Sequence, residues 1–259
     1  AAKEYGVGKV LKRGEKLKVN LPAGKAGSKK FSDVRITERG VHFSVDGKRQ
    51  FMSPEDSIKT QEKIGADIIF AFDECTSPLH SLSYTTGAME RTHRWAVRCL
   101  KTRKRQDQML FGIVQGGRFR SLRSASARFI GMLPFDGIGI GGSFGKNEMV
   151  RTLKAVVPHL PDEKPRHLLG IGAVEDIFNA IEEGIDLFDC VIPTREARHG
   201  RIYAATGTRN IRIKTPEDAR KATMQNVRFF NALLENIRRA IRQGKFLTFK
   251  RKTIAMYHH

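Results

Sequence analysis

Short apolar runs alternate with helix-forming segments over residues 53–190, and this alternation constrains the fold more than any other feature. Strands that are apolar on both faces and separated by helices predict a parallel sheet covered by helices. The fold class is therefore α/β, and 259 residues suffice for one barrel of about 250 residues. The predicted strands are 68–72, 109–114, 137–140, 166–169 and 187–188, and the predicted helices are 54–64, 89–100, 118–132, 147–157 and 175–183.

The first predicted helix carries start and stop signals, and the segments outside the alternation are different in character. Ser53 and Pro54 are typical of a helix start, and Gly65 of its end. Residues 34–45 predict a β-hairpin or meander with turns at 39–40 and 46–47, and residues 223–243 predict an amphipathic helix. We expect one domain over residues 1–259, made of a basic N-terminal region (1–50), a βα core (51–213) and a basic C-terminal helical segment (214–259).

Positive charge is concentrated in the two flanks of the chain. Residues 1–50 hold 13 Lys and Arg against 5 Asp and Glu, residues 195–259 hold 16 against 4, and residues 51–194 are neutral. A net charge of +20 is typical of proteins with a polyanionic partner, although a dispersed solvated surface has the same composition. Because the positive charge is confined to the two flanks, we expect the partner to be RNA or DNA.

Composition also excludes several classes of protein. No apolar run approaches the roughly 18 residues of a membrane span, so no membrane partner is expected. Cys75, Cys99 and Cys190 are too far apart in sequence for a disulfide framework or a metal cluster. We therefore expect a protein of the reducing cytoplasm.

The carboxyl ends of the predicted strands carry residues suited to ligand binding. In parallel α/β sheets, ligands bind outside these ends. Small residues there admit a ligand to the backbone, while Asp and Gln supply hydrogen bonds. One such residue alone would be ordinary turn chemistry, but five in succession predict a binding site. They are Asp73, Gln115, Gly142, Gly170 and Asp189.

Five motifs occur in a fixed order along the chain. They are Phe72-Asp73-Glu74-Cys75, Met89-Glu90-Arg91-Thr92, Phe111-Gly112-Ile113-Val114-Gln115-Gly116-Gly117, Ile140-Gly141-Gly142 and Phe188-Asp189-Cys190-Val191-Ile192-Pro193-Thr194-Arg195. Together they closely resemble the bacterial tRNA-guanine transglycosylases, also called queuine tRNA-ribosyltransferases, from about residue 34 to 213 and again from about 224 to 249. The resemblance implies a TIM-like (β/α)8 barrel that exchanges guanine at the anticodon wobble position for a 7-deazaguanine base, in queuosine modification.

The resemblance also implies site residues. Asp189 resembles the nucleophile that attacks the ribose anomeric carbon and expels guanine, forming a covalent Asp-ribosyl tRNA intermediate. Asp73 and Gln115 resemble the pair that binds the edge of the base. The other base-contacting positions are Gly142, Ser143 and Leu169.

Two stretches resemble RNA-contacting segments, and their partner would be a tRNA with a G-U-N anticodon. A helix starting near Glu175 would direct free N–H groups toward a phosphate. The resemblance further implies a homodimer. The first stretch is Gly170, Ile171, Gly172, Ala173, Val174, Glu175 and Asp176, and the second, which resembles the wobble-recognition segment, is Thr194, Arg195, Glu196, Ala197 and Arg198.

The chemistry of these residues agrees with the implied reaction. Displacement of a base from ribose passes through an oxocarbenium-like state, and a carboxylate nucleophile such as Asp189 divides it into two displacements with retained configuration. The N1–H and exocyclic amino group of guanine match a carboxylate acceptor such as Asp73, and Gln115 offers both a donor and an acceptor. The target base must also leave the anticodon stack to reach the pocket.

Three departures from the family pattern stand out. A Thr-Asp-Ser-Gly-Gly motif that supplies the family's general base is absent, and we expect it, with the first barrel strands, to precede Ala1. The Cys-x-Cys-x2-Cys run and the His of the family's structural zinc are also absent, and Gln225 replaces the His; we therefore expect no metal or other cofactor, or an omitted segment near 215–223. The loop after Gly142 is one residue shorter than in the family, and Lys146 stands where the family commonly has Glu. Because the resemblance implies that these positions help to choose the incoming base, that base is open between the aminomethyl pre-queuosine base, which we expect, and queuine.

Two other functions remain open from sequence. A non-catalytic tRNA-binding subunit of a transglycosylase complex would explain the absent general base. An unrelated barrel enzyme that acts on a phosphorylated small molecule would share only the fold.

Overall fold

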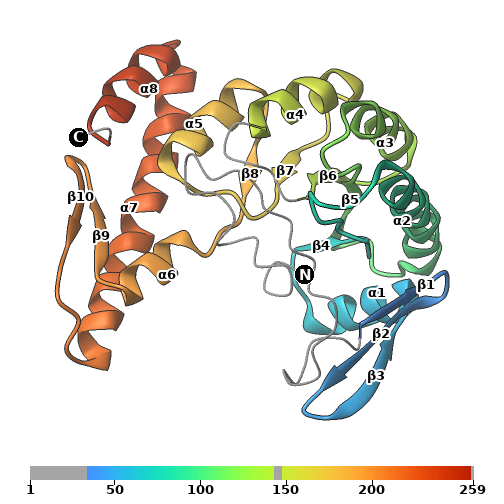
Figure 1. The fold of residues 1–259 in the computed structure, drawn as a ribbon. Helices are drawn as coiled ribbons and strands as arrows, with labels where there is room; N and C mark the ends of the chain where they lie inside the picture. The colour runs from blue at the N-terminus through green and yellow to red at the C-terminus, as the bar shows by residue number, and fades with distance from the viewer. Residues whose placement is uncertain (1–33, 143–147, 258–259) are drawn as a thin grey trace. The chain divides into compact units, whose positions relative to one another are not determined.

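The computed structural model describes residues 34–142 and 148–257 (Figure 1). The chain divides into two compact units. The first comprises the described part of Ala1–Leu168 together with Glu183–Leu187, and the second comprises Leu169–Glu182 and Phe188–His259. A single domain over residues 1–259 stays a prediction.

A five-stranded sheet forms the core of the first unit. The β4–β5, β5–β6 and β6–β7 pairs are parallel, which confirms the predicted α/β class with a parallel sheet. The order of the strands in the sheet is their order in the chain, as in a segment of a βα barrel. The strands are β4 (Ile68–Phe70), β5 (Met109–Val114), β6 (Gly137–Ile140), β7 (Arg166–Leu168) and β8 (Leu187–Phe188).

Helices alternate with these strands as predicted, and the second helix differs most in length from its predicted range. Ser53 caps the first helix through a capping box with Asp56, and Gly65 ends it at φ 78°. The second helix begins seven residues before the predicted start, because Ser81 accepts a hydrogen bond from the backbone of Tyr84. The helices are α1 (Pro54–Ile64), α2 (Leu82–Thr102), α3 (Arg120–Met132) and α4 (Met149–Val156), followed by a short 3-10 turn (Val157–His159).

A three-stranded antiparallel sheet precedes α1. Its strands are β1 (Arg35–Thr37), β2 (Gly40–Val45) and β3 (Lys48–Met52). The first turn lies at 38–39, one residue earlier than predicted, because Gly40 already pairs with Thr37. The second turn lies at 46–47 as predicted, and β3 follows it as the third strand of the meander.

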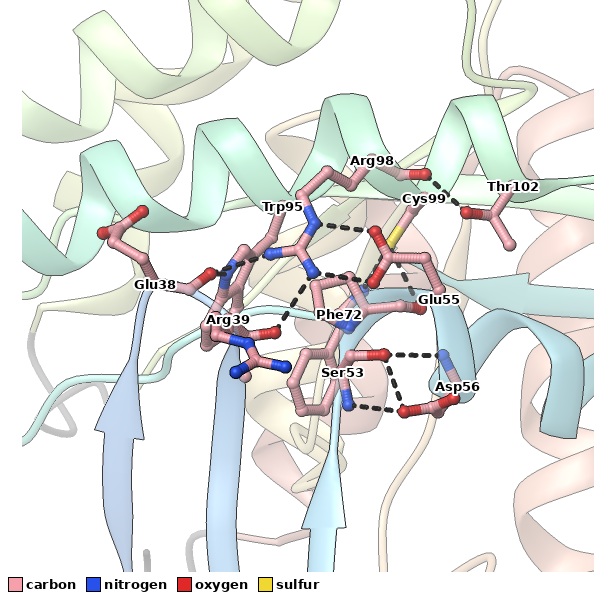
Figure 2. A network of polar contacts seen from close by, with 12 residues as sticks. Glu38, Arg39, Ser53, Glu55, Asp56, Phe72, Trp95, Arg98, Cys99 and Thr102 are labelled. Atoms are coloured by element: carbon pink, nitrogen blue, oxygen red, sulfur yellow. Dashed lines mark hydrogen bonds and ion pairs between the residues drawn. The ribbon is translucent and has the colours of Figure 1, made fainter.

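Arg98 of α2 binds both this sheet and α1 (Figure 2). Its guanidinium forms two 2.7 Å hydrogen bonds to the carboxylate of Glu55 on α1. It also donates to the backbone carbonyls of Glu38 and Arg39 in the β1–β2 turn. Because the indole of Trp95 donates to the Glu38 carbonyl as well, α2 holds this turn through side chain-to-backbone hydrogen bonds.

The second unit is made of helices and a two-stranded antiparallel ribbon, β9–β10. Asn226, fully buried in α7, accepts from the N–H of Tyr203 and donates to the carbonyls of Pro193 and Arg201, so one side chain connects α7, α6 and β9. The predicted helix 223–243 begins earlier, because Thr215 and Asp218 form a capping box. The elements are α5 (Val174–Glu182), α6 (Ile192–Arg198), β9 (Arg201–Ala204), β10 (Gly207–Asn210), α7 (Pro216–Arg242) and α8 (Phe246–Ala255).

The helices have no membrane-spanning character. Over residues 34–142 and 148–257, none is both long enough and apolar enough to cross a bilayer.

Candidate active site

Asp73 and Gln115 are in contact at the carboxyl ends of β4 and β5. Nε2 of Gln115 donates a hydrogen bond of 2.6 Å to Oδ2 of Asp73. Desolvation raises the pKa of the Asp73 carboxyl to about 6, although the hydrogen bond from Gln115 opposes this effect. At neutral pH the carboxylate is therefore mostly ionised but poorly solvated, and a ligand with N–H groups would compensate for the missing water.

The amide oxygen of Gln115 is the second acceptor of this site. Oε1 is buried and has no hydrogen-bond partner within the described residues. A buried acceptor without a partner costs about 1–3 kcal/mol, so a ligand that donates to Oε1 would gain free energy by binding. Asp73 and Gln115 together therefore favour a planar ligand with adjacent donors on one edge.

Two glycines bring the end of β6 close to this pair. A Cβ on Gly141 would lie 2.7 Å from Nε2 of Gln115, so a larger residue would displace the amide. Gly142 has φ +119°, and a Cβ there would lie 2.1 Å from Nη2 of Arg123. Ser143, also predicted in this floor, lies outside the described residues.

Helix α2 holds the residue that follows Asp73. The buried carboxylate of Glu74 accepts a 2.8 Å hydrogen bond from the hydroxyl of Tyr84 and forms an ion pair with Arg91. The backbone N–H of Glu74 donates to Oγ1 of Thr92 at 3.0 Å. Because Glu74 is fixed by three side chains of one helix, the backbone of Asp73 is restrained as well.

Arg123 of α3 is a buried cation that sequence analysis missed. It is 1% exposed, and desolvation lowers the pKa of its guanidinium to about 10. Its guanidinium joins the loop after β5 to the end of β6. The acceptors are the backbone carbonyls of Val114, Gly117 and Gly141.

Ser126 is a second buried polar residue of α3 that was not predicted. Its Oγ accepts a 3.1 Å hydrogen bond from the backbone N–H of Gln115. The helical spacing of the buried positions is the signal in the sequence that points to Arg123 and Ser126. Arg123 stands four and seven positions before Ala127 and Ile130, and Ser126 stands four before Ile130, so both belong to the buried stripe of the helix.

Asp189 lies in the second unit, directly after β8. It is exposed, and its Oδ1 accepts a 3.0 Å hydrogen bond from the backbone N–H of Gly170. Gly170 has φ +74° and follows Leu169, the partly exposed residue predicted to contact the base. A Cβ on Gly172 would lie 1.9 Å from the sulfur of Cys190, so the loop after β7 packs closely against the strand end that carries Asp189.

The first predicted RNA-contacting stretch, residues 170–176, contains both exposed and buried residues. Helix α5 begins at Val174, one residue before the predicted start, and the Val174 side chain belongs to the hydrophobic core of the second unit. Gly172 is buried, whereas Ile171 and Ala173 are partly exposed. The first turn carries acidic residues at 175 and 176, which oppose a phosphate there electrostatically. Phosphate contact by this stretch stays a prediction.

The second predicted stretch, residues 194–198, lies in helix α6. Arg195 and Arg198 are exposed, whereas Ala197 is fully buried and cannot reach RNA. Glu196 lies 3.8 Å from an arginine of β9, and Thr194 donates to a backbone carbonyl at the start of the helix. The two arginines are therefore the residues of this stretch that are available to a phosphate.

The described residues do not fit the family's structural zinc ion. Within them, no group of three His, Cys, Asp or Glu side chains could hold a metal. Gln225, at the position of the family's His, donates through Nε2 to the carbonyl of Tyr203 at 3.4 Å.

Comparison with known proteins identifies the family. The family model described as queuine tRNA-ribosyltransferase matches residues 23–222. The chain is 42% identical over 253 residues to the queuine tRNA-ribosyltransferase of Herpetosiphon aurantiacus, an alignment that covers 83% of this chain and 64% of the relative. It is 39% identical over 265 residues to that of Halothermothrix orenii, with 87% of this chain and 71% of the relative covered.

These matches settle the family and define the extent of the likeness. The chain spans 64% and 71% of the two relatives, so it corresponds to most of their length but not all of it. The family model covers well over half of the chain, and it includes the Asp73–Gln115 pair and Asp189. The chain belongs to the queuine tRNA-ribosyltransferase family, the tRNA-guanine transglycosylases that modify tRNA in the queuosine pathway.

Proposed function

We propose that this chain exchanges guanine at the wobble position of tRNAs with a G-U-N anticodon for a 7-deazaguanine base. The observation that carries the proposal is the contact between Gln115 and Asp73, which leaves a carboxylate and an amide oxygen as acceptors at the end of the sheet. Guanine and 7-deazaguanine share the N1–H and exocyclic amino donors that such a pair binds. Family membership supports the same substrate class.

Asp73 and Gln115 recognise the base in this proposal. The Asp73 carboxylate accepts from N1–H and one N–H of the amino group, and the second amino N–H is available to Oε1 of Gln115. Binding favours the ionised form of Asp73, whose pKa burial raises to about 6. Base binding therefore weakens as the pH falls below about 6, because the protonated carboxyl loses an acceptor.

Asp189 is the nucleophile in this proposal. One of its carboxylate oxygens forms a bond to C1′ of the ribose, and the bond from C1′ to guanine breaks with its electron pair on the base. The departing guanine anion takes up one proton. In the second displacement a ring nitrogen of the 7-deazaguanine loses one proton, forms the new bond to C1′ and releases the carboxylate, so the proton count balances over the exchange. Two inversions give net retention. The N–H of Gly170, which donates to Oδ1, holds the carboxylate in one orientation.

The proposal extends to the rest of the protein and its setting. The five strands belong to a (β/α)8 barrel, the fold works without zinc, and the active form is a cytoplasmic homodimer. The charge of +20 and the exposed Arg195 and Arg198 support tRNA as the partner.

The incoming base is identified by nucleoside analysis. The protein is incubated with unmodified tRNA bearing a G-U-N anticodon and, in separate reactions, with the aminomethyl pre-queuosine base or queuine, and the nucleosides are analysed by mass spectrometry. We expect the pre-queuosine base at the wobble position. Retained tRNA binding without incorporation of either base would instead favour a non-catalytic tRNA-binding subunit.

A further inference from the structure

A chain of three buried groups leads from α2 through α3 to the backbone of Gln115. Nε2 of His93 lies 3.0 Å from Oγ of Ser126, and the same oxygen accepts the N–H of Gln115 at 3.1 Å. Ser126 is fully buried and His93 is 9% exposed. The hydrogen bonds of this chain are therefore shielded from water, which makes their loss costly.

His93 is held in a fixed position by its own surroundings. Its ring stacks on Phe129 with centroids 4.2 Å apart and an interplanar angle of 15°. Burial lowers the pKa of the imidazole to about 4, so the ring is neutral near pH 7. Because the oxygen of Ser126 accepts from Gln115, its hydroxyl proton is available to His93, which fits an unprotonated Nε2.

The other contacts of α3 restrain the residues around Gln115 and leave its own N–H to Ser126. Arg123 holds the carbonyl of Val114, immediately before Gln115, and that of Gly141, against which the Gln115 amide lies. No other acceptor for the Gln115 N–H is found within the described residues. Ser126 is thus the contact that acts on Gln115 itself.

We propose that Ser126 and His93 are positioning residues for base recognition, which hold the Gln115–Asp73 pair in the orientation that receives the base. This inference rests on the proposed function. The two residues do not touch the base. Their contribution is to the binding of the base and is the same before and during the displacement, so it affects KM for the base rather than kcat.

The test compares two serines of the same helix. Ser126→Ala removes the acceptor of the Gln115 N–H. Ser124→Ala removes a hydroxyl that donates a 2.8 Å hydrogen bond to the carbonyl of Ala155, away from the site. The assay measures exchange of labelled guanine into tRNA with a G-U-N anticodon. For Ser126→Ala we expect KM for guanine to rise about tenfold, with kcat and KM for tRNA within about twofold of the unsubstituted protein. Ser124→Ala should leave all three constants unchanged.

A second pair of variants keeps the inference testable if Ser126→Ala does not fold. His93→Leu removes the partner of Ser126, whereas His93→Gln supplies an amide oxygen that can accept the Ser126 hydroxyl proton in place of Nε2. We expect KM for guanine to rise in His93→Leu and to return toward the original value in His93→Gln. A merely structural role would lower the melting temperature in both without this rescue.

The outcomes separate the inference from the function on which it rests. Exchange by the unsubstituted protein, together with an unchanged KM for guanine in Ser126→Ala or in His93→Leu, would overturn the positioning role and leave the proposed function intact. A fall in kcat with KM unchanged would also overturn it. No exchange by the unsubstituted protein would overturn both.

Discussion

The amide of Gln115 and the carboxylate of Asp73, 42 positions apart in the chain, are joined by a hydrogen bond of 2.6 Å. The parallel pairing of Phe70 with Phe111 places the ends of β4 and β5 side by side, so the two residues meet just beyond the sheet. The carboxylate of Asp73 is poorly solvated there, and its pKa is raised to about 6. The ionised Asp73 carboxylate therefore lowers the stability of the folded protein, as is common for residues of a binding site.

Asp73→Asn should stabilise the protein at neutral pH while it removes base binding. A folded-state pKa of about 6 against an ordinary value of 3.8 means that the unfolded chain ionises first, so stability falls as pH rises from about 4 to 6. At pH 7 the shift of about two units corresponds to up to about 3 kcal/mol, which the neutral amide avoids. Denaturant unfolding at pH 7 and pH 4 measures this, and the gain should shrink at pH 4.

The matched control for this prediction is Asp107→Asn. Asp107 is an exposed residue whose pKa is lowered by its hydrogen bonds with Arg105, so its removal should not stabilise the fold. The account of Asp73 would be contradicted by an Asp73→Asn protein that is no more stable than the unsubstituted chain at pH 7.

Gly112→Ala should destabilise the first unit by about 1–3 kcal/mol, because the interior has no room for a methyl group. A Cβ on Gly112 would lie 2.4 Å from the ring of Phe135. Gly87→Ala is the control, since no side chain or other segment lies within 4 Å of its Cβ position in α2, and it should stabilise by about 0.5–1 kcal/mol. Both changes are read from urea midpoints, and equal effects of the two substitutions would refute the packing argument.

Arg98→Ala should raise the pKa of Glu55 from about 2 toward its ordinary value. The hydrogen bonds from Arg98 are the largest cause of the lowered pKa, and they are visible in Figure 2. The stability they provide is present above the ordinary pKa of Glu55 and is lost as pH falls toward 2. Carboxyl carbon NMR titration of Glu55 measures the shift. Arg94→Ala, whose arginine binds Glu38 rather than Glu55, should leave this pKa unchanged, and a shift of the same size in that variant would contradict the assignment.

The strands and several helix ends were predictable because local chemistry decides them. The apolar run of β5 ends at Gln115, which is followed by two glycines. Both β5 and β6 have the predicted bounds. Helix α1 has its cap at Ser53 and its end at Gly65, as its sequence indicates. The rule that parallel strands end at the same edge predicted Asp73 and Gln115 at one edge of the sheet, whereas the resemblance to the family implied that they form a pair.

Other features depend on tertiary contacts that the pattern does not contain. The first turns of α2 are rich in Ser, Thr and Gly, which are weak helix formers, and the segment is helical because Ser81 caps it and Thr85 and Ala88 are buried. Helix α6 and the β9–β10 ribbon are short and were not predicted. Arg123 lies on the apolar stripe of α3, but the carbonyls that it binds come from separate segments that only the fold brings together.

The most direct test of the central claim is the exchange of labelled guanine by the unsubstituted protein and by Asp189→Asn. Because guanine is the leaving group, the covalent intermediate can accept it again, so the assay does not depend on which 7-deazaguanine is used. We expect incorporation at the wobble position by the unsubstituted protein, none by Asp189→Asn, and equal tRNA affinity for both. Exchange that persists in Asp189→Asn would contradict the nucleophile, and the absence of exchange in both, despite tRNA binding, would contradict the transglycosylase.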